Sequence, residues 1–419
     1  MIIVEKALAA STRDGAVGRL RGDGATASGT MWGMFAARTG WDRTPNRLAA
    51  AAGRRTADLI DLTVSNPTQW GLAYDREAIL RALARPEALT YGPEARGLPV
   101  ARAAVAAYYA ERGVEVNIAD LLLTASSSEA YAYLFRLLCA PGDTVLVPTP
   151  SYPLFELLAG LNDVRLRPYP LFYDHGWHLD AVALEAAIQP HTRAIVCVHP
   201  NNPSGSYLKQ EEWEQVQALA AAHELAVIVD EVFFDYALAA DPERMVNPCN
   251  QPPALTFVLN GLSKLAALPQ MKLGWMAIAG PPPLVEEAGQ RLEIIADTYL
   301  SVCTAIQWAA PTLLATRRTM QPQLLSRLKA NLQALDEQIA SHSGGVTRLV
   351  VEGGWSVVLR VPRWRSDDAW AEHLVAAAGV LVHPGHFYDF PDEGHLVLSL
   401  LPQPERFQHG VAQMLRAVG

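Results

Sequence analysis

Three stretches near the middle of the chain decide the fold: AIVCVHPNNPSGS at residues 194–206, AVIVDEVF at 226–233 and TFVLNGLSK at 256–264. Each begins with a short, mostly apolar run and then turns abruptly polar. Successive residues of a strand face opposite sides of a sheet, so a strand that is apolar throughout must be covered on both faces. The pattern is typical of buried parallel strands in a layered β/α protein.

The same alternation extends outward in both directions. Further apolar runs occupy residues 121–124, 144–147 and 275–278, and helix-like stretches such as 129–138 and 211–223 separate most of the runs. Alternating strands and helices predict an α/β domain with a parallel sheet that helices cover on both faces.

The pattern changes near residue 310. A long helical stretch is followed by a strand-like, a helix-like and a second strand-like stretch, at 317–342, 355–361, 368–378 and 396–400. This order predicts a smaller α+β domain. Residues 1 to about 30 are rich in Gly, Ala, Ser, Thr and Arg without a period, which indicates a loose arm. We therefore expect three parts: a partly flexible arm at 1–60 that could join the small domain, a large domain at 61–310 and a small domain at 311–419.

Composition excludes several classes of protein. Of the 419 residues, 50% are hydrophobic and 18% charged, so the chain is neither disordered nor fibrous. A net charge of −9 disfavours nucleic acid and anionic membranes as partners. No apolar run reaches the roughly 18–20 residues that a membrane span needs. The four cysteines are scattered and the start lacks a basic leader, so we expect a cytoplasmic protein.

Polar residues follow the apolar runs at the carboxyl ends of the strands, where parallel sheets form their ligand sites. Ser126, Ser127 and Ser128 come after the run at 121–124 and open a helix-like stretch. Free amides and hydroxyls at a helix start can cradle a phosphate. An ordinary serine cap is the simpler explanation for such serines taken alone.

The next strand ends carry an amide, a carboxylate and an amine. Asn202 stands in a proline-rich turn after the run at 194–198, and Asp230 directly follows the run at 226–229. Lys264 lies on a Gly/Ser turn after 256–259, where desolvation would lower the pKa of its amine and suit it to form a Schiff base. A lone lysine is more often a solvated surface residue.

Taken together, these motifs resemble the fold type I pyridoxal-phosphate enzymes, specifically the class I/II aminotransferases, over about residues 60–410. The resemblance implies a large domain whose mainly parallel, seven-stranded sheet lies between helices, and a smaller α+β domain. It also implies pyridoxal 5′-phosphate as cofactor and an amino donor and a 2-oxo acid as substrates. The last implication is a homodimer with shared active sites.

The resemblance assigns four residues around the cofactor ring. Lys264 would form the Schiff base and later move the proton between substrate and cofactor. Asp230 would pair with the pyridinium nitrogen and keep it protonated. Asn202 would donate a hydrogen bond to the ring O3′, and Tyr152, in Pro150-Ser151-Tyr152-Pro153, would stack on the ring face.

The resemblance also implies a phosphate site. Ser127, Ser128 and Ser263 would hold the phosphate with amides and hydroxyls. Lys272 occupies the position of an arginine that usually binds the phosphate, so the charge is kept but the bidentate fork is lost. Tyr91, in Tyr-Gly-Pro-x-x-x-Gly, resembles the tyrosine that reaches the phosphate of the neighbouring subunit.

The chain departs from the family pattern at three further positions. Phe233 replaces a tyrosine that gives O3′ a second hydrogen bond, and Gly261 replaces a hydroxyl residue. Val397 stands where the family has the arginine that clamps the substrate carboxylate. Either another cation substitutes, such as Arg360 or one of Arg38, Arg43 and Arg47, or the substrate is held differently or is not a plain α-amino acid.

Three functions follow from these residues. The first is an aminotransferase, and the second is another pyridoxal-phosphate reaction, namely a β-lyase, decarboxylase, cyclising synthase or oxidase. The third is a non-catalytic binding or regulatory protein, which the intact Lys264 and Asp230 disfavour. No metal site is expected, because the spacing of His383, His386 and His395 fits no metal-ligand signature.

Overall fold

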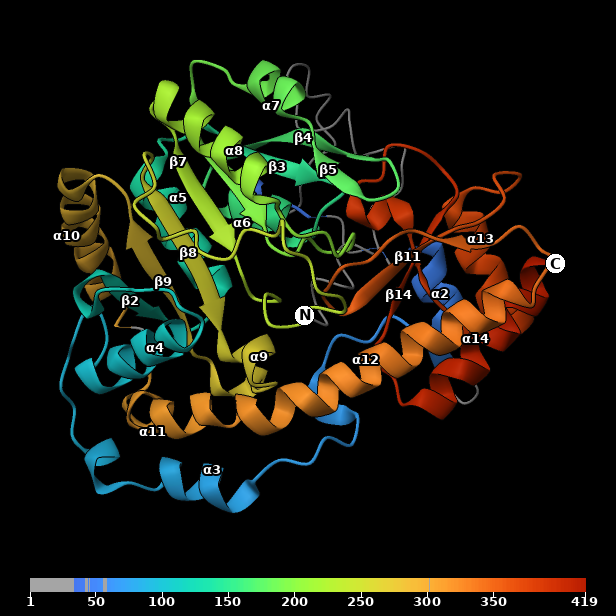
Figure 1. The fold of residues 1–419 in the computed structure, drawn as a ribbon, viewed down its shortest axis with the longest axis horizontal. Coiled ribbons are helices and arrows are strands. Elements are labelled where there is room, and N and C mark those ends of the chain that lie inside the picture. The colour runs from blue at the N-terminus through green and yellow to red at the C-terminus, as the bar shows by residue number, and fades with distance from the viewer. Residues whose placement is uncertain (1–33, 42–43, 45, 56–58, 301) are drawn as a thin grey trace.

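The computed structural model describes residues 34–41, 44, 46–55, 59–300 and 302–419, so most of the expected N-terminal arm lies outside the described residues. Its largest element is an eight-stranded sheet with the order β2-β9-β8-β7-β6-β3-β4-β5 (Figure 1). The strands are β2 (Leu121–Thr124), β3 (Thr144–Thr149), β4 (Arg165–Tyr173), β5 (Trp177–Leu179), β6 (Thr192–Val198), β7 (Ala226–Asp230), β8 (Thr256–Gly261) and β9 (Gly274–Ala279).

The middle of this sheet is parallel. Strands β8, β7, β6, β3 and β4 run in one direction. Strand β9 is antiparallel to both of its neighbours, and β5 forms an antiparallel pair with β4. All six apolar runs read from the sequence lie in strands of this sheet.

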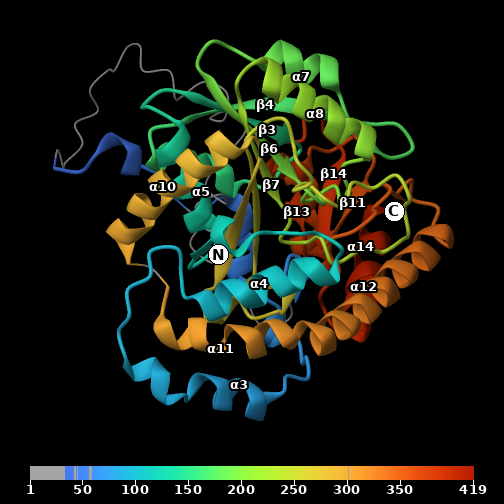
Figure 2. The same cartoon turned by 60° about the vertical axis from the view of Figure 1, so that its left-hand side comes forward.

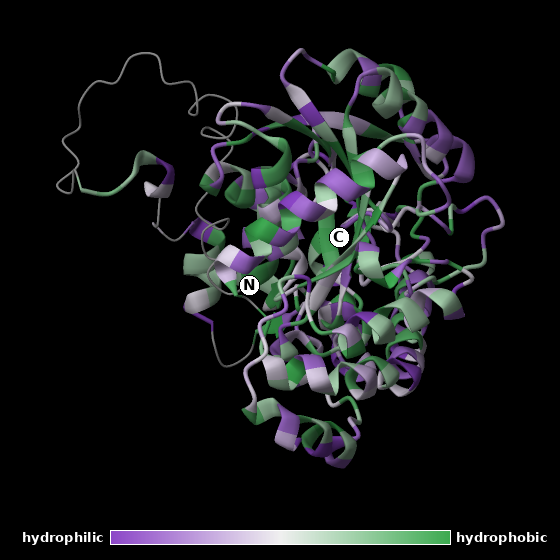
Figure 3. Cartoon of the chain, turned by 90° about the vertical axis from the view of Figure 1, so that its left-hand side faces the viewer, coloured by the Kyte–Doolittle hydropathy of each residue, from purple (hydrophilic) through white to green (hydrophobic). Residues whose placement is uncertain are grey.

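Both faces of the sheet are covered, as the uniformly apolar strands predicted. Along β7, Val227 and Val229 pack into one core and Ile228 into the other. The first core also receives helices α4, α8 and α11, and the second receives α5, α6 and α10 (Figure 2). In Figure 3 the central strands are mostly green, and the helices outside them mix green with purple. The helices are α2 (Arg47–Gly53), α3 (Arg76–Leu83), α4 (Pro99–Glu111), α5 (Ser127–Leu138), α6 (Leu154–Leu161), α7 (Ala181–Ala187), α8 (Gln210–Ala222), α9 (Leu262–Leu265), α10 (Pro282–Tyr299) and α11 (Thr304–Ala315).

The sheet has one strand more than the seven that were expected. Strands β4 and β5 form a hairpin at one end of the sheet, where β4 is only partly buried and contains Pro168 and Pro170. Edge strands tolerate proline and polar residues because one of their sides needs no partner. The sequence pattern of a fully buried strand therefore does not appear there.

A second, four-stranded sheet lies in the C-terminal part of the chain. Its order is β10 (Thr347–Arg348), β11 (Ser356–Arg360), β14 (His395–Ser399) and β13 (His383–Pro384). Its core is shared with helices α12 (Arg317–Ala340), α13 (Asp367–His373) and α14 (Pro404–Val418), and the predicted helix over 368–378 ends in a π-helical segment, Leu374–Ala378. Near the start of the described chain, β1 (Ile60–Asp61) pairs with β12 (Val380–Leu381).

The two sheets are joined by α12 and by a short segment before β11. Helix α12 runs from beside α11 to α14 (Figure 1). The amides of Gly353 and Gly354 donate to the carbonyls of Gly205 and Tyr236 at 2.9 and 3.0 Å. These bonds hold the residue that follows, Trp355, against the carboxyl edge of the large sheet.

Candidate active site

Lys264 lies at the carboxyl end of β8, in the short helix α9. Leu262 and Leu265 are fully buried and fix this helix, while the Tyr236 hydroxyl donates to the Lys264 carbonyl at 2.5 Å. The Lys264 amine donates to the Ser65 carbonyl at 3.4 Å. The catalytic lysine that the sequence predicted is therefore half-buried at the sheet edge and is not a solvated surface residue.

Asp230 ends the neighbouring strand β7 and is 8% exposed. Its two carboxylate oxygens accept from the Tyr131 hydroxyl and the Val232 amide, each at 3.1 Å. Burial raises the pKa of Asp230 to about 6, while the hydrogen bonds and the nearby Lys264 amine oppose the rise. A buried carboxylate in this setting favours a cationic partner, such as a protonated ring nitrogen.

Asn202 and Tyr152 lie on two loops that a third residue ties together. The Asn201 side-chain amide donates to the Pro150 carbonyl and to the Ser204 hydroxyl, both at 2.9 Å. This arrangement joins the turn of Asn202 to the loop of Tyr152. Asn202 and Tyr152 are both half-buried.

The three serines of the predicted phosphate cradle lie at the start of helix α5. Ser126 is the N-cap of α5, and its hydroxyl accepts from the Glu129 amide at 3.2 Å. Ser127 and Ser128 form the first turn, where amides lack intrahelical acceptors and the helix dipole favours an anion. A Cβ on Gly274 would lie 2.9 Å from the Ser126 carbonyl carbon, so only glycine allows β9 to pass this close to the cradle.

Ser263 and Lys272 lie on the chain segment that connects β8 to β9. Ser263 is half-buried beside Lys264, and Lys272 is exposed two residues before Gly274. A Cβ on Gly261 would lie 3.0 Å from the Leu273 carbonyl oxygen and 3.1 Å from the Gly274 Cα. The absence of a hydroxyl residue at 261 therefore has a steric reason in this chain.

Tyr91 lies apart from the other predicted residues. Its side chain is 69% exposed and lines a surface groove with Glu94, Leu300 and Val302. None of the other predicted site residues is among the described residues that line this groove.

Val397 is buried in an apolar cluster, with 1% of its surface exposed. Its partners across the strands are Val358 and His383, and the cluster also contains Trp177, Leu349, Tyr388 and Phe390. Burial lowers the pKa of His383 to about 4, so this neighbour is neutral at neutral pH.

The substitute cations are not placed equally. Arg360 follows Val358 by two residues on β11, and its guanidinium lies 4.9 Å from the Tyr173 ring centroid, at the rim of the Val397 cluster. Arg38 and Arg47 instead pair with Asp163 and Glu372, at 2.7 and 3.7 Å. Arg43 lies outside the described residues.

Sequence reasoning missed two residues at the site. Tyr131 follows Ser127 by four residues on α5, so helical periodicity could have placed it beside the cradle. Trp355 had no comparable signal. Its ring centroid is 4.8 Å from the Lys264 amine, and it meets Phe233 edge-on with ring centroids 5.3 Å apart.

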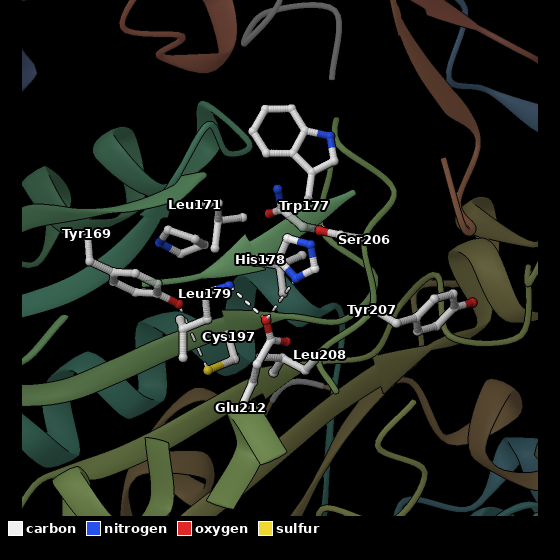
Figure 4. A pocket seen from close by; sticks show the side chains of 13 residues that line it. Tyr169, Leu171, Trp177, His178, Leu179, Cys197, Ser206, Tyr207, Leu208 and Glu212 are labelled. Atoms are coloured by element: carbon white, nitrogen blue, oxygen red, sulfur yellow. Dashed lines mark hydrogen bonds and ion pairs between the residues drawn. The ribbon is translucent and has the colours of Figure 1, made fainter. Parts of the chain in front are cut away.

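A cavity lies beside the site, between β4, β5, β6 and the loop after β6 (Figure 4). Its empty volume is about 330 Å³, open solvent included. Cys197 lines it, and burial raises the pKa of the Cys197 thiol to about 12, so the sulfur is not a nucleophile at neutral pH. Glu212 is held by the Leu179 amide at 2.8 Å. Neither Lys264 nor Asp230 lines this cavity.

These residues fit pyridoxal phosphate. The buried Asp230 carboxylate ends β7, and the Lys264 amine follows β8. The helix start that suits an anion follows β2, and the position that only glycine can occupy, Gly274, begins β9. Among the described residues no group of three or more His, Cys, Asp or Glu side chains could hold a metal ion.

Comparison with known proteins agrees with this geometry. Nicotianamine aminotransferase 1 of Oryza sativa is 31% identical over 53% of this chain and 45% of its own length. Glutamate-pyruvate aminotransferase AlaA of Escherichia coli is 30% identical over 61% of this chain, and the match spans 63% of that relative. Arginine–pyruvate transaminase AruH of Pseudomonas aeruginosa is 30% identical over 74% of this chain and 78% of its own length.

Solved structures show the same fold. The alanine aminotransferase of Pyrococcus furiosus superposes with a TM-score of 0.80 at 23% identity, over 88% of this chain and 95% of that chain. The family model for aminotransferase class I and II matches residues 57–409. This chain therefore belongs to the class I and II aminotransferase family.

Proposed function

We propose that the protein is a pyridoxal-phosphate-dependent aminotransferase that moves an amino group from an amino donor to a 2-oxo acid. The observation that carries the proposal is the convergence of Lys264 and Asp230 at the carboxyl ends of adjacent strands, with an anion-binding helix start nearby. The names of relatives such as glutamate-pyruvate aminotransferase and arginine–pyruvate transaminase support the same reaction.

When bound, pyridoxal phosphate supplies an aldehyde that reacts with amines and a ring that takes up the electron pair released at the substrate carbon. Lys264 Nζ would hold the cofactor through its aldehyde and would carry the proton to and from the substrate. The Ser127 and Ser128 amides, with Ser263 and Lys272, would hold the phosphate. Asn202 would donate to the ring oxygen, and Tyr152 would pack against the ring.

Asp230 keeps the ring nitrogen protonated only while its own carboxyl is ionised. Its pKa of about 6 lies below neutral pH, so the carboxylate form predominates at pH 7.5. The Tyr131 hydroxyl, which donates to Asp230 at 3.1 Å, stabilises that charged form. A protonated ring nitrogen beside this carboxylate would lower its pKa below that of the apoprotein, so activity should fall only at a pH below about 6.

Borohydride reduction followed by peptide mapping tests the lysine assignment. A covalent cofactor label should appear on Lys264, and a label on any other lysine would contradict the assignment. Adding a panel of amino acids and amines while following the cofactor absorbance then identifies the reaction. Transamination converts the cofactor to its amine form without ammonia release, whereas β-elimination releases ammonia.

A homodimer forms part of the proposal. Leu89, Tyr91, Ile294 and Leu300 are apolar or aromatic side chains that are 64–91% exposed, on the segment before α4 and around α10. Large side chains of this kind are usual at subunit interfaces. Sedimentation at micromolar concentration tests it: a monomer with full cofactor occupancy would contradict a shared active site.

The remaining parts of the proposal concern organisation. We divide the chain into an arm at 1–60, a large domain at 61–310 and a small domain at 311–419, and we place the protein in the cytoplasm. The separate cores of the two sheets support a large and a small domain, but Leu313 and Leu314 of α11 pack into the large-sheet core, so this helix belongs with the large domain. Across the described residues, none of the helices combines the length and the apolar character that a membrane span requires. Limited proteolysis and cell fractionation test the two assignments.

A further inference from the structure

An indole N–H beside Lys264 has no acceptor among the residues that the structure describes. Trp355 is 4% exposed, and its Nε1 atom is buried without a hydrogen-bond partner among the described residues. A buried donor that lost its water and gained no acceptor is costly, so most buried polar groups are paired. This donor therefore points to an acceptor that arrives with a ligand.

The ring is held from both sides, so its N–H does not turn freely. Trp355 meets Phe233 and Tyr236 edge-on, with ring centroids 5.3 and 5.2 Å apart and interplanar angles of 70° and 71°. Its carbonyl accepts from the Leu400 amide at 2.7 Å. Phe233 and Tyr236 follow β7 in the large sheet, whereas Leu400 follows β14 in the small one.

The Trp355 N–H lies where it could bind an oxygen of a substrate whose amino group reacts at Lys264. The amine lies over the ring, 4.8 Å from its centroid, whereas the N–H lies in the ring plane. The two groups therefore face adjacent volumes. Both are donors when the lysine is protonated, so neither satisfies the other. A substrate that presents its amino group at Lys264 could reach the indole with an oxygen at a hydrogen-bond distance of about 2.9 Å.

We propose that the Trp355 Nε1–H donates a hydrogen bond to a carboxylate oxygen of the substrate, which makes Trp355 a specificity-determining residue. This inference rests on the proposed aminotransferase function, because a 2-oxo acid carries such a carboxylate beside its reacting carbon. An ionised acceptor makes this bond shorter and stronger than a neutral one.

Trp177 provides a matched alternative within the same chain. Its Nε1 is also buried without a partner among the described residues, and its side chain is 6% exposed. It lines the cavity of Figure 4, which Lys264 does not line, and it belongs to the Val397 cluster. A substrate carboxylate that binds beside Lys264 would therefore contact the Trp355 N–H, whereas one that binds in the cavity of Figure 4 would contact the Trp177 N–H.

The test uses the full-length enzyme in its pyridoxamine form with ¹⁵N-labelled indoles. Trp355→Phe and Trp177→Phe each remove one signal and assign it, and Trp355→Tyr serves if the first variant is unstable. We expect 2-oxoglutarate and phenylpyruvate to move the Trp355 indole signal downfield, while phenylacetone, which lacks the carboxylate, leaves it in place. In kinetics, Trp355→Phe should raise the KM for the 2-oxo acid roughly tenfold or more, whereas Trp177→Phe should not.

The outcomes separate this inference from the proposed function. If the 2-oxo acid changes the cofactor absorbance but leaves the Trp355 signal unmoved, or moves the Trp177 signal instead, the inference is wrong while the aminotransferase function stands. The same holds if phenylacetone moves the Trp355 signal as far as phenylpyruvate does. If no 2-oxo acid alters the absorbance, the proposed function fails and the inference fails with it.

Discussion

The active site has two sides that differ in how their polar groups are satisfied. On the large-sheet side, Asp230 accepts from Tyr131 and Val232, and Ser126 caps α5. On the small-sheet side, Trp355 and Val397 lie in apolar surroundings, and no described residue accepts a hydrogen bond from the Trp355 N–H. The first side is preorganised by the chain for a ligand of fixed charge. The second side leaves its donor for a substrate that comes and goes.

A buried ion pair supports the large-sheet side, which we call the polar side; the small-sheet side is called the apolar side. Glu231, next to Asp230, is fully buried and receives two hydrogen bonds from Arg112, at 2.7 and 3.0 Å. Arg112 also donates to the Tyr108 hydroxyl, which in turn accepts from Asn260 at 3.3 Å. The network therefore connects the end of β7 to the end of β8. This buried network thereby links the two strand ends that carry Asp230 and Lys264.

We expect the largest effect on turnover from removing the Lys264 amine, which lies between the two sides of the site. Lys264→Ala should lower turnover by at least about 10³-fold, because it removes both the covalent attachment and the proton carrier. The fold should be retained, because only one half-buried amine is lost. Single-turnover absorbance and circular dichroism measure the two quantities. Residual turnover above a few per cent of wild type would show that another residue moves the proton.

The next largest effect, on the free energy of unfolding, should come from breaking the buried Arg112–Glu231 ion pair behind the polar side. Arg112→Leu leaves Glu231 buried without its partner, which should lower the free energy of unfolding by about 3–5 kcal/mol. The control is Arg291→Leu, because Arg291 pairs with Glu287 in an exposed ion pair, 64% and 57% accessible, whose loss should cost less than about 1 kcal/mol. Urea denaturation compares them. Equal losses in the two variants would contradict a structural role for the buried pair.

The ionisation of Asp230 should make the stability of the apoprotein depend on pH. Its folded-state pKa of about 6 exceeds the ordinary 3.8, so between these values the folded apoprotein binds more protons than the unfolded chain. The stability from this group is therefore present at low pH and falls as the pH rises through that window, by about 3 kcal/mol.

Asp230→Asn should remove this dependence. The variant apoprotein should be more stable than wild type at pH 7.5, and the difference should vanish near pH 4, while the loaded enzyme loses activity. Urea denaturation of both apoproteins at the two pH values measures the effect. A variant that is less stable than wild type at pH 7.5 would show that the carboxylate is paired within the apoprotein.

We expect the smallest effect, on kcat/KM for small amino acids, from a substitution of Val397 on the apolar side. Wild type should turn over alanine, aspartate and glutamate poorly, and Val397→Arg should raise kcat/KM for them by about tenfold, since an arginine adds a charge-assisted contact. Val397→Leu controls for the change in volume. Steady-state kinetics decide it: ordinary efficiency of wild type on these amino acids would mean that a cation such as Arg360 already binds the carboxylate.

Much of the large-sheet side could be predicted because its signals are local. An apolar run that ends in Asp230 or in the Ser263-Lys264 turn is visible within a few residues, and parallel strands bring their carboxyl ends to one edge. The edge hairpin of β4 and β5 was not predicted, because half-exposed strands lack the uniformly apolar signal. Val397 was noticed only through the family resemblance, and its cluster appeared only in the structure.

The sequence by itself determined the layered fold, the order of the strand-end loops and the lysine and carboxylate at their centre. Short-range periodicity and strand-end chemistry are sufficient for those features. Tertiary structure alone decided that Tyr131 donates to Asp230, 99 residues away, and that Trp355 covers the Lys264 amine. Contacts of this kind depend on how helices and sheets pack, and no local pattern of apolar residues specifies which distant side chain fills the space beside a reactive group.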